Sequence, residues 1–224
     1  MLAMKILQHD KVLFVGDSIT DCMRRRPVGT GGGLGLGYVA MFHAWVKLKR
    51  PELALDVINM GVSGNTIRLM ADRWQTDVLS FQPDVLFILI GVNDVWHDLA
   101  DIPNGVSAPK FERVYDLMLD ELVEALPHTR LLILEPFVLP GPATKNPDNP
   151  ALWEFFSREV PLRAQAARRV AERHHAYFLP LQERFDEACR LAEPVYWLRD
   201  GVHPSPMGHE LIAREWIKAF RQIG

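Results

Sequence analysis

The sequence predicts an α/β fold: a three-layer α/β/α sandwich around a central parallel sheet, formed by a single domain over residues 1–224. Two observations support this prediction. Five short runs are apolar and β-branched throughout, which is typical of strands buried on both faces. Segments with helical spacing of apolar residues separate these runs, so strands and helices alternate along the chain. A chain of this length can bury one substantial core.

The elements follow in order from these patterns. We expect strands at residues 11–16, 55–61, 84–91, 130–137 and 176–181. We expect the main helices at residues 38–50, 66–79, 111–126, 153–173 and 205–220. Pro161 has no backbone N–H and should kink or split the fourth helix. Ser205 suits the N-cap of the last helix, and Pro206 suits its first position.

The composition excludes several classes of function. A net charge of −3 shows no basic excess, so no nucleic-acid partner and no anionic membrane partner is expected. The two cysteines, Cys22 and Cys189, are too few and too far apart for a disulfide framework or a metal-type pair. The first ten residues do not resemble a signal peptide, and no apolar run is long enough to span a bilayer. We therefore expect a cytoplasmic protein.

Small and polar residues follow the first three predicted strands. Gly16-Asp17-Ser18 comes after the first strand, "GVSGN" (61–65) after the second, and "GVND" (91–94) after the third. In an open parallel sheet, ligands bind outside the carboxyl ends of the strands. The sequence thus predicts a site at this edge. The stretch "LPGPATKNPDNP" (139–150) is a loop by composition and is long enough to border that site.

A serine needs a base before it can act as a nucleophile, and the C-terminal part of the chain offers one. Asp200 and His203 are three residues apart, so one turn can bring the carboxylate beside the imidazole. The carboxylate would fix the tautomer, and His203 could then deprotonate Ser18. Candidate donors to an oxyanion are the N–H of Ser18, the N–H of Gly64 and the side-chain amide of Asn93.

Four short motifs carry a family resemblance. "GDSITD", "GVSGNT", "GVND" and "DGVH" resemble, in this order, the four sequence blocks of the GDSL, or SGNH, hydrolase family. Ile19 departs from the leucine of the family name, which is a conservative change. The resemblance implies a flavodoxin-like five-stranded sheet. The family's functional residues carry over to Ser18, Gly64, Asn93 and His203, with Asp200 as the partner of the histidine.

Longer segments narrow the resemblance. "GDSITDCMRRRP", "GVSGNTIRLMADRW" and "VHPSPMGH" are most similar to the acetylxylan esterases and related carbohydrate deacetylases of that family. This implies a serine esterase that removes acetyl groups from a small-molecule or oligosaccharide ester such as acetylated xylan. It also implies no cofactor, no metal and a homo-oligomer.

Other functions stay open at this stage. A lysophospholipase or thioesterase of the same family would need an apolar acyl groove. A carbohydrate-binding protein could use the same fold without catalysis. A metal-dependent phosphoesterase could use hard oxygen and imidazole ligands. Its candidate ligands are Asp17, Asp21, Asn93, Asp94, His97 and His203.

Several residues near the motifs have no assigned role in the sequence. We expect Asp17 to hold the turn around Ser18 by hydrogen bonds. Trp96 and Trp197 could contact substrate or pack in the core. Four arginines could contact substrate or solvent: Arg24, Arg25, Arg26 and Arg199.

Overall fold

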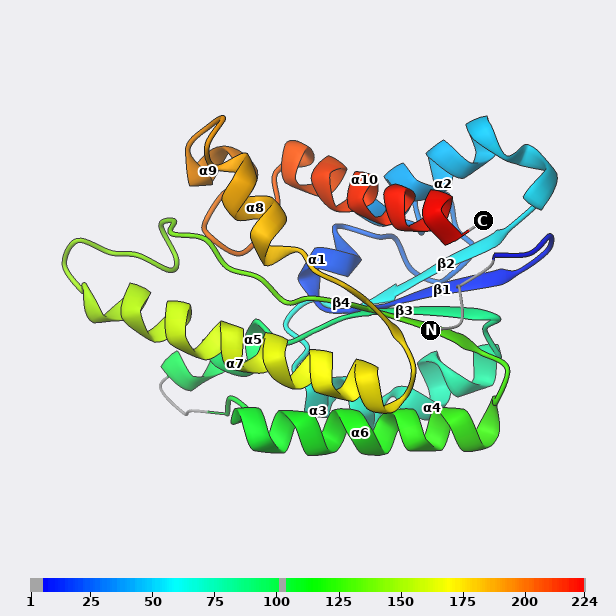
Figure 1. The fold of residues 1–224 in the computed structure, drawn as a ribbon, viewed down its shortest axis with the longest axis horizontal. Coiled ribbons are helices and arrows are strands. Elements are labelled where there is room, and N and C mark those ends of the chain that lie inside the picture. Colours follow the sequence, from blue (N-terminus) through cyan, green and yellow to red (C-terminus); the bar gives the residue numbers. More distant parts are fainter. Residues whose placement is uncertain (1–5, 101–103, 224) are drawn as a thin grey trace.

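Five parallel strands form one central sheet in the computed structural model, which describes residues 6–100 and 104–223 (Figure 1). The strands are β1 (Lys11–Gly16), β2 (Asp56–Gly61), β3 (Val85–Leu89), β4 (Arg130–Leu134) and β5 (Tyr177–Leu179). Their order in the sheet is β2-β1-β3-β4-β5, which is the flavodoxin-like order. The predicted fold class is confirmed. The ends of the predicted domain, at residues 1–5 and 224, lie outside the described residues, so its limits stay a prediction.

Helices cover both faces of the sheet (Figure 1). On one side lie α1 (Ser18–Asp21), α2 (Tyr38–Lys49), α8 (Gln182–Ala188), α9 (Pro194–Trp197) and α10 (Pro206–Ile223). On the other lie α3 (Ile67–Asp72), α4 (Trp74–Asp77), α5 (Asn93–Trp96), α6 (Ala108–Ala125) and α7 (Ala151–Arg173). Short 3₁₀ turns occur at Pro51–Leu53, Leu79–Phe81 and His97–Leu99. Within the described residues, no helix has the length and apolar character needed to cross a membrane.

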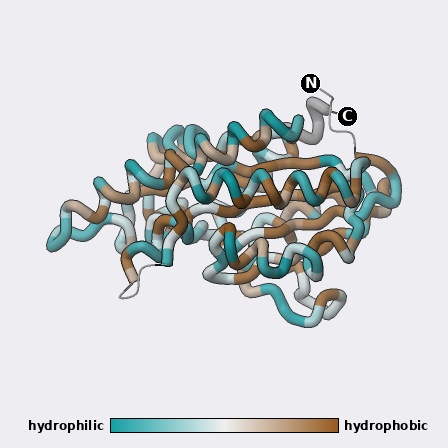
Figure 2. Tube along the Cα trace, turned by 90° about the horizontal axis from the view of Figure 1, so that it is seen from below, coloured by the Kyte–Doolittle hydropathy of each residue, from teal (hydrophilic) through white to brown (hydrophobic). Residues whose placement is uncertain are grey.

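Each face of the sheet packs into its own hydrophobic core, because successive strand residues point to opposite sides. Phe14 of β1 lies in one core, where its ring stacks on that of Phe87 with centroids 4.5 Å apart. Phe42 of α2 and Trp216 of α10 close this core with ring centroids 3.8 Å apart. Leu13 lies in the opposite core, under α3, α6 and α7. Figure 2 shows the strands as mainly hydrophobic segments and the outer helices as alternating.

Two predicted helices differ from the structure. The predicted helix 66–79 is divided into α3 and α4 at Arg73, whose side chain reaches back to the strand ends. Pro161 does not split α7, which is one helix from Ala151 to Arg173. The carbonyl that loses its partner belongs to the half-buried Ser157, where water can replace the missing N–H.

The start of α10 agrees with the predicted cap. Ser205 Oγ accepts a hydrogen bond from the Gly208 N–H at 3.2 Å and donates one to the Tyr196 carbonyl at 2.6 Å. Pro206 is the first helical residue, where its missing N–H has no acceptor to lose. The cap places the segment that precedes α10 over the carboxyl edge of the sheet.

The aromatic core predicts a large effect of truncation. Phe14→Ala should lower the free energy of unfolding by about 3–5 kcal/mol, since the ring is fully buried between β3 and α2. Urea unfolding measures the change. Leu48→Ala is the matched control, because Leu48 is 73% exposed on α2 and should change stability by less than about 0.5 kcal/mol. Equal effects of the two substitutions would contradict this account of the core.

Candidate active site

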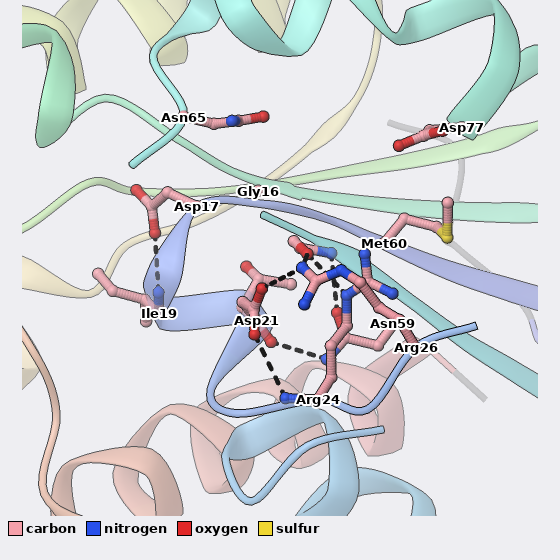
Figure 3. Close-up of polar contacts among 12 residues, drawn as sticks. Gly16, Asp17, Ile19, Asp21, Arg24, Arg26, Asn59, Met60, Asn65 and Asp77 are labelled. Atoms are coloured by element: carbon pink, nitrogen blue, oxygen red, sulfur yellow. Dashed lines mark hydrogen bonds and ion pairs between the residues drawn. The ribbon is translucent and has the colours of Figure 1, made fainter. Parts of the chain in front are cut away.

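Ser18 lies at the carboxyl end of β1, as the first residue of α1. Asp17 caps this helix, because its Oδ1 accepts the Ile19 N–H at 2.9 Å (Figure 3). The helix sits directly against the end of β2, where only glycine fits. A Cβ at Gly61 would lie 2.2 Å from the Asp21 nitrogen. The expected turn-holding hydrogen bond of Asp17 is therefore present, and the serine side chain has a defined position.

The structure brings the predicted acid and base to Ser18. His203 Nε2 is 2.9 Å from Ser18 Oγ, and His203 Nδ1 is 2.7 Å from Asp200 Oδ2. Asp200 Oδ1 accepts the backbone N–H groups of Val202 at 2.9 Å and His203 at 2.8 Å. The turn from Asp200 to His203 thus holds the carboxylate and the imidazole together, over a serine 185 positions away in the sequence.

The pKa values of Asp200 and His203 depend on each other. The hydrogen bond that His203 donates to Asp200 raises the pKa of His203, against the opposing effect of burial. Burial alone would raise the pKa of Asp200, but hydrogen bonds from the His203 side chain and from two backbone N–H groups hold that pKa below its ordinary value. Asp200 therefore stays ionised and keeps the proton on Nδ1 of His203. Nε2 is then free to accept the hydroxyl proton of Ser18.

Gly64 and Asn93 follow the ends of β2 and β3 at the same edge. Gly64 has φ +80°, a conformation that favours glycine, and an added Cβ there would meet no atom within 4 Å. Open space therefore lies next to Gly64. Asn93 Nδ2 donates one hydrogen to the Asn65 carbonyl at 3.1 Å, which leaves its second hydrogen for another acceptor. The Ser18 N–H lies in the first turn of α1, where no acceptor exists within the helix.

The loop 139–150 borders the site as expected. The Leu139 N–H bonds to the Gly201 carbonyl at 2.9 Å, and the Ala143 N–H bonds to the Asp200 carbonyl at 2.9 Å. Thr144 is fully buried within this loop, and its Oγ1 donates to the Leu139 carbonyl at 2.6 Å. The loop therefore supports the backbone of the acid–base turn.

The arginines near Ser18 separate into two groups. Arg24 is buried, and its Nε donates to the Gly61 carbonyl at 2.7 Å. Arg26 Nη2 pairs with Asp21 Oδ2 at 2.5 Å (Figure 3). Both anchor the segment after α1 to the end of β2. The remaining two, Arg25 and Arg199, are exposed.

The two tryptophans left open by the sequence are half-buried. The ring of Trp96 lies 5.8 Å from that of His203 and packs edge-on against Phe156 at 6.0 Å. Trp96 therefore lies between His203 and the hydrophobic core. Trp197 packs against Tyr196 at 5.0 Å and lines a cavity of about 600 Å³ between α8 and α10.

Two of the candidate metal ligands, Asp21 and Asp94, have other partners. Asp21 pairs with Arg26, and both carboxylate oxygens of Asp94 accept the Ile67 N–H, at 3.0 and 3.2 Å. Among residues 6–100 and 104–223, no three His, Cys, Asp or Glu side chains are grouped as metal ligands. The geometry thus favours the serine-based site over the phosphoesterase alternative.

A second histidine, His209, lies behind the site. Its Nδ1 accepts the Tyr38 N–H at 3.3 Å, so Nε2 carries the proton and faces Cys22 Sγ at 3.2 Å. Burial lowers the pKa of His209 to about 4. It is a neutral structural residue at ordinary pH, whereas His203 has a raised pKa.

Comparison with known proteins decides the family. A model of the GDSL-like lipase/acylhydrolase family matches residues 14–211. The chain belongs to this family. The GDSL-family chain is also 36% identical to an acetylxylan esterase of Geobacillus stearothermophilus, over 99% of its own length and 97% of that protein. It is therefore a carboxylic ester hydrolase.

Solved structures agree with this assignment. A protein from Parabacteroides merdae, described as a GDSL-like lipase, superimposes with a TM-score of 0.87 at 36% identity and covers 97% of this chain and 99% of its own. Axe2, an acetylxylan esterase of Geobacillus stearothermophilus, gives a TM-score of 0.84 at 34% identity over 97% of this chain and 96% of its own. The fold and the family are the same by sequence and by structure.

Arg73 has no role that the sequence patterns indicate, although it lies in one of the segments that carry the family resemblance. Arg73 lies within a run with helical spacing, where an arginine is usually exposed. In the GDSL-family structure its guanidinium instead contacts the ends of β1 and β2. The division of the predicted helix at this residue shows only in the structure.

Asp17 gives this site a testable pH dependence. Burial raises its pKa from 3.8 to about 7, so in this interval the folded protein binds more protons than the unfolded chain. The free energy of unfolding therefore falls as the pH rises through that interval. Asp17→Asn removes this loss and keeps an oxygen for the Ile19 N–H. The stability of the variant relative to wild type should increase between pH 5 and pH 8, as measured by urea unfolding.

Asp98→Asn is the control for this experiment, because Asp98 is exposed. Its stability relative to wild type should be independent of pH over the same range. A constant difference between Asp17→Asn and wild type at all pH values would contradict the assignment of a buried, proton-binding carboxyl at Asp17.

Proposed function

We propose that this GDSL-family protein is a serine esterase that removes acetyl groups from sugar hydroxyls, with acetylated xylan or xylo-oligosaccharides as substrate. The observation that carries the proposal is the hydrogen-bonded chain Ser18–His203–Asp200 at the carboxyl edge of the sheet. Nucleophile, base and orienting carboxylate lie in hydrogen-bond reach of one another, as covalent catalysis by serine requires.

The first half of the reaction is acylation. Ser18 Oγ attacks the ester carbonyl while His203 Nε2 takes the hydroxyl proton, and Asp200 stabilises the resulting imidazolium. The N–H groups of Ser18 and Gly64 and the side-chain amide of Asn93 donate hydrogen bonds to the tetrahedral oxyanion. His203 then gives its proton to the departing sugar hydroxyl, and the acetyl group stays on Ser18.

The second half is deacylation by water. His203 Nε2 takes a proton from water, and the resulting hydroxide oxygen attacks the acetyl carbonyl. The same donors bind the second oxyanion. Its collapse breaks the bond to Ser18 Oγ, which recovers the proton from His203, and acetate leaves. Side chains, backbone N–H groups and water fill every role in this cycle, so the proposed reaction takes no cofactor and no metal.

Two kinds of support favour the acetyl-sugar substrate. The Geobacillus relatives are named acetylxylan esterase and acetyl-xylooligosaccharide esterase. Catalytic mutants of that enzyme replace a serine near the N-terminus, an aspartate, and a histidine three positions after the aspartate. Ser18, Asp200 and His203 have the same types and the same aspartate–histidine spacing. The side chains of Asp200 and His203 are about one-third exposed, which leaves the site open to a bulky alcohol.

The other expectations about the environment of the protein stay predictions. These are the cytoplasmic location, the homo-oligomer, and the absence of nucleic-acid and membrane partners. Gel filtration with light scattering measures the oligomeric state directly.

Loss of the nucleophile tests the proposal. Ser18→Ala should lower kcat for p-nitrophenyl acetate by at least about 10³-fold, because it removes the hydroxyl that is hydrogen-bonded to His203 and forms the acyl-enzyme. EDTA should leave the wild-type rate unchanged, and acetate should be a better acyl group than octanoate. Release of acetate from acetylated xylo-oligosaccharides, measured by NMR, then identifies the natural class of substrate.

Each alternative function gives a different result. Preference for octanoate would favour a lysophospholipase or thioesterase. A rate that survives Ser18→Ala but is abolished by EDTA would replace the serine mechanism with metal-dependent catalysis. Sugar binding without ester hydrolysis would indicate a carbohydrate-binding protein.

The pairing of Asp200 with His203 predicts a change in the pH profile. His203 must be neutral to act as base, so kcat/KM falls as the pH falls through its raised pKa. Asp200→Asn removes the carboxylate that raises this pKa. The acidic limb of the profile should therefore move to lower pH, and kcat should fall by about 10⁴-fold because the tautomer is no longer fixed. An acidic limb that stays in place would assign it to a group other than His203.

A further inference from the structure

Arg73 makes an unusual set of contacts at the junction of α3 and α4. Its side chain is 15% exposed, and its guanidinium reaches four acceptors on three segments of the chain. The acceptors are Asn65 Oδ1 at 2.6 Å, the Met60 carbonyl at 2.8 Å, Asp77 Oδ2 at 2.8 Å and the Gly16 carbonyl at 3.1 Å. The four residues that supply these acceptors are labelled in Figure 3.

Two of these acceptor residues, Gly16 and Asn65, adjoin the proposed oxyanion donors. Gly16 is the last residue of β1 and lies two positions before Ser18. Asn65 directly follows Gly64, and its carbonyl accepts the hydrogen bond from Asn93 Nδ2 at 3.1 Å. Each donor is therefore at most two residues or one hydrogen bond from a group that Arg73 holds.

The contact with Met60 connects Arg73 to the end of β2. Met60 lies in β2, one residue before the strand ends at Gly61, and the turn that carries Gly64 begins there. Val15 of β1 pairs with Met60, and Gly16 pairs with Gly61. Arg73 thus spans two adjacent strand ends and the turn above them with one rigid group.

We propose that Arg73 is a positioning residue that holds the Ser18, Gly64 and Asn93 donors in the arrangement that binds the oxyanion. This inference rests on the proposed serine-esterase function. Arg73 does not touch the reacting atoms in this mechanism. It acts through Gly16 on the nucleophile turn and through Asn65 on the other two donors.

The shape of the guanidinium explains why arginine occupies this position. Its planar fork has five N–H donors with fixed directions, and Arg73 uses its Nε and both terminal nitrogens. A lysine ammonium keeps the charge but presents its donors from a single point. The ion pair with Asp77 is only one of the four contacts, and the other three are to neutral oxygens, so charge alone does not account for the arginine. The value of Arg73 therefore lies in geometry.

Arg73→Lys tests the inference with the charge retained. We expect kcat for p-nitrophenyl acetate to fall about 10²-fold with KM unchanged, because donors displaced by about 1 Å lose their alignment with the oxyanion. Arg68→Lys is the matched control, since Arg68 is an exposed arginine of α3. It should leave kcat and KM as in wild type. Thermal unfolding of each variant is recorded alongside.

A double-mutant cycle separates positioning from a general structural role. Asn93→Ala removes one of the donors, so if Arg73 acts through the oxyanion hole its substitution must cost less in that background. We expect the loss from Arg73→Lys to shrink from about 10²-fold to less than about 10-fold. A loss of the same size in both backgrounds, or a change confined to KM, would overturn the proposal. So would an unchanged kcat in Arg73→Lys.

Chemical rescue gives an independent measurement. In Arg73→Ala, free guanidinium at concentrations below those that unfold the protein should restore part of kcat, and methylammonium should not. Equal rescue by the two cations would show that charge alone matters and would overturn the geometric role. If Arg73→Ala does not fold, Arg73→Lys and its cycle with Asn93→Ala decide the question.

Ser18→Ala distinguishes failure of this inference from failure of the proposed function. Full activity of Ser18→Ala would reject the serine mechanism, and the role of Arg73 would be rejected with it. Loss of activity in Ser18→Ala with no kcat effect in Arg73→Lys would reject the role of Arg73 alone.

Discussion

The parallel pairing of β1 with both β2 and β3 is the constraint from which the geometry of the site follows. Gly16 of β1 lies beside Gly61 of β2 and Leu89 of β3, so the three strands end at one level. Parallel strands also send all their following loops to the same edge of a sheet. Groups separated by tens of residues along the chain therefore meet without any long-range loop. Two apolar cores, one on each face, hold the strands in this register.

The site carries an energetic cost that the cores must offset. Asp17 and Asp94 are almost fully buried at the strand ends, and burial raises the pKa of each to about 7. Each also makes a hydrogen bond that shapes the edge, to Ile19 and to Ile67 respectively. Buried carboxyls of this kind destabilise a fold unless their hydrogen bonds compensate. The local structure around the nucleophile therefore lowers the stability of the fold.

Much of the fold and of the candidate site could be predicted from the sequence. The strand runs were readable because buried parallel strands are apolar throughout. The observed strand order is the flavodoxin-like one that the family resemblance implies. Ser18, Asp200 and His203 stood in short motifs, and the structure brings them together. Arg73 and Thr144 could not be found in this way. Their importance comes from tertiary contacts with backbone carbonyls, which leave no periodic pattern in the sequence.

The support of Asp200 by the loop 139–144 makes the site modular. The nucleophile and its neighbouring donors belong to the sheet edge, whereas Asp200 and His203 belong to a turn whose backbone is held by the loop 139–144. Connecting segments tolerate more sequence change than strands do. Variation in that loop can therefore change the orientation and the pKa of the His203 imidazole, while Ser18 keeps its position at the end of β1. Related enzymes can therefore differ in the loop that supports Asp200 and His203 while they keep the sheet edge that carries the serine.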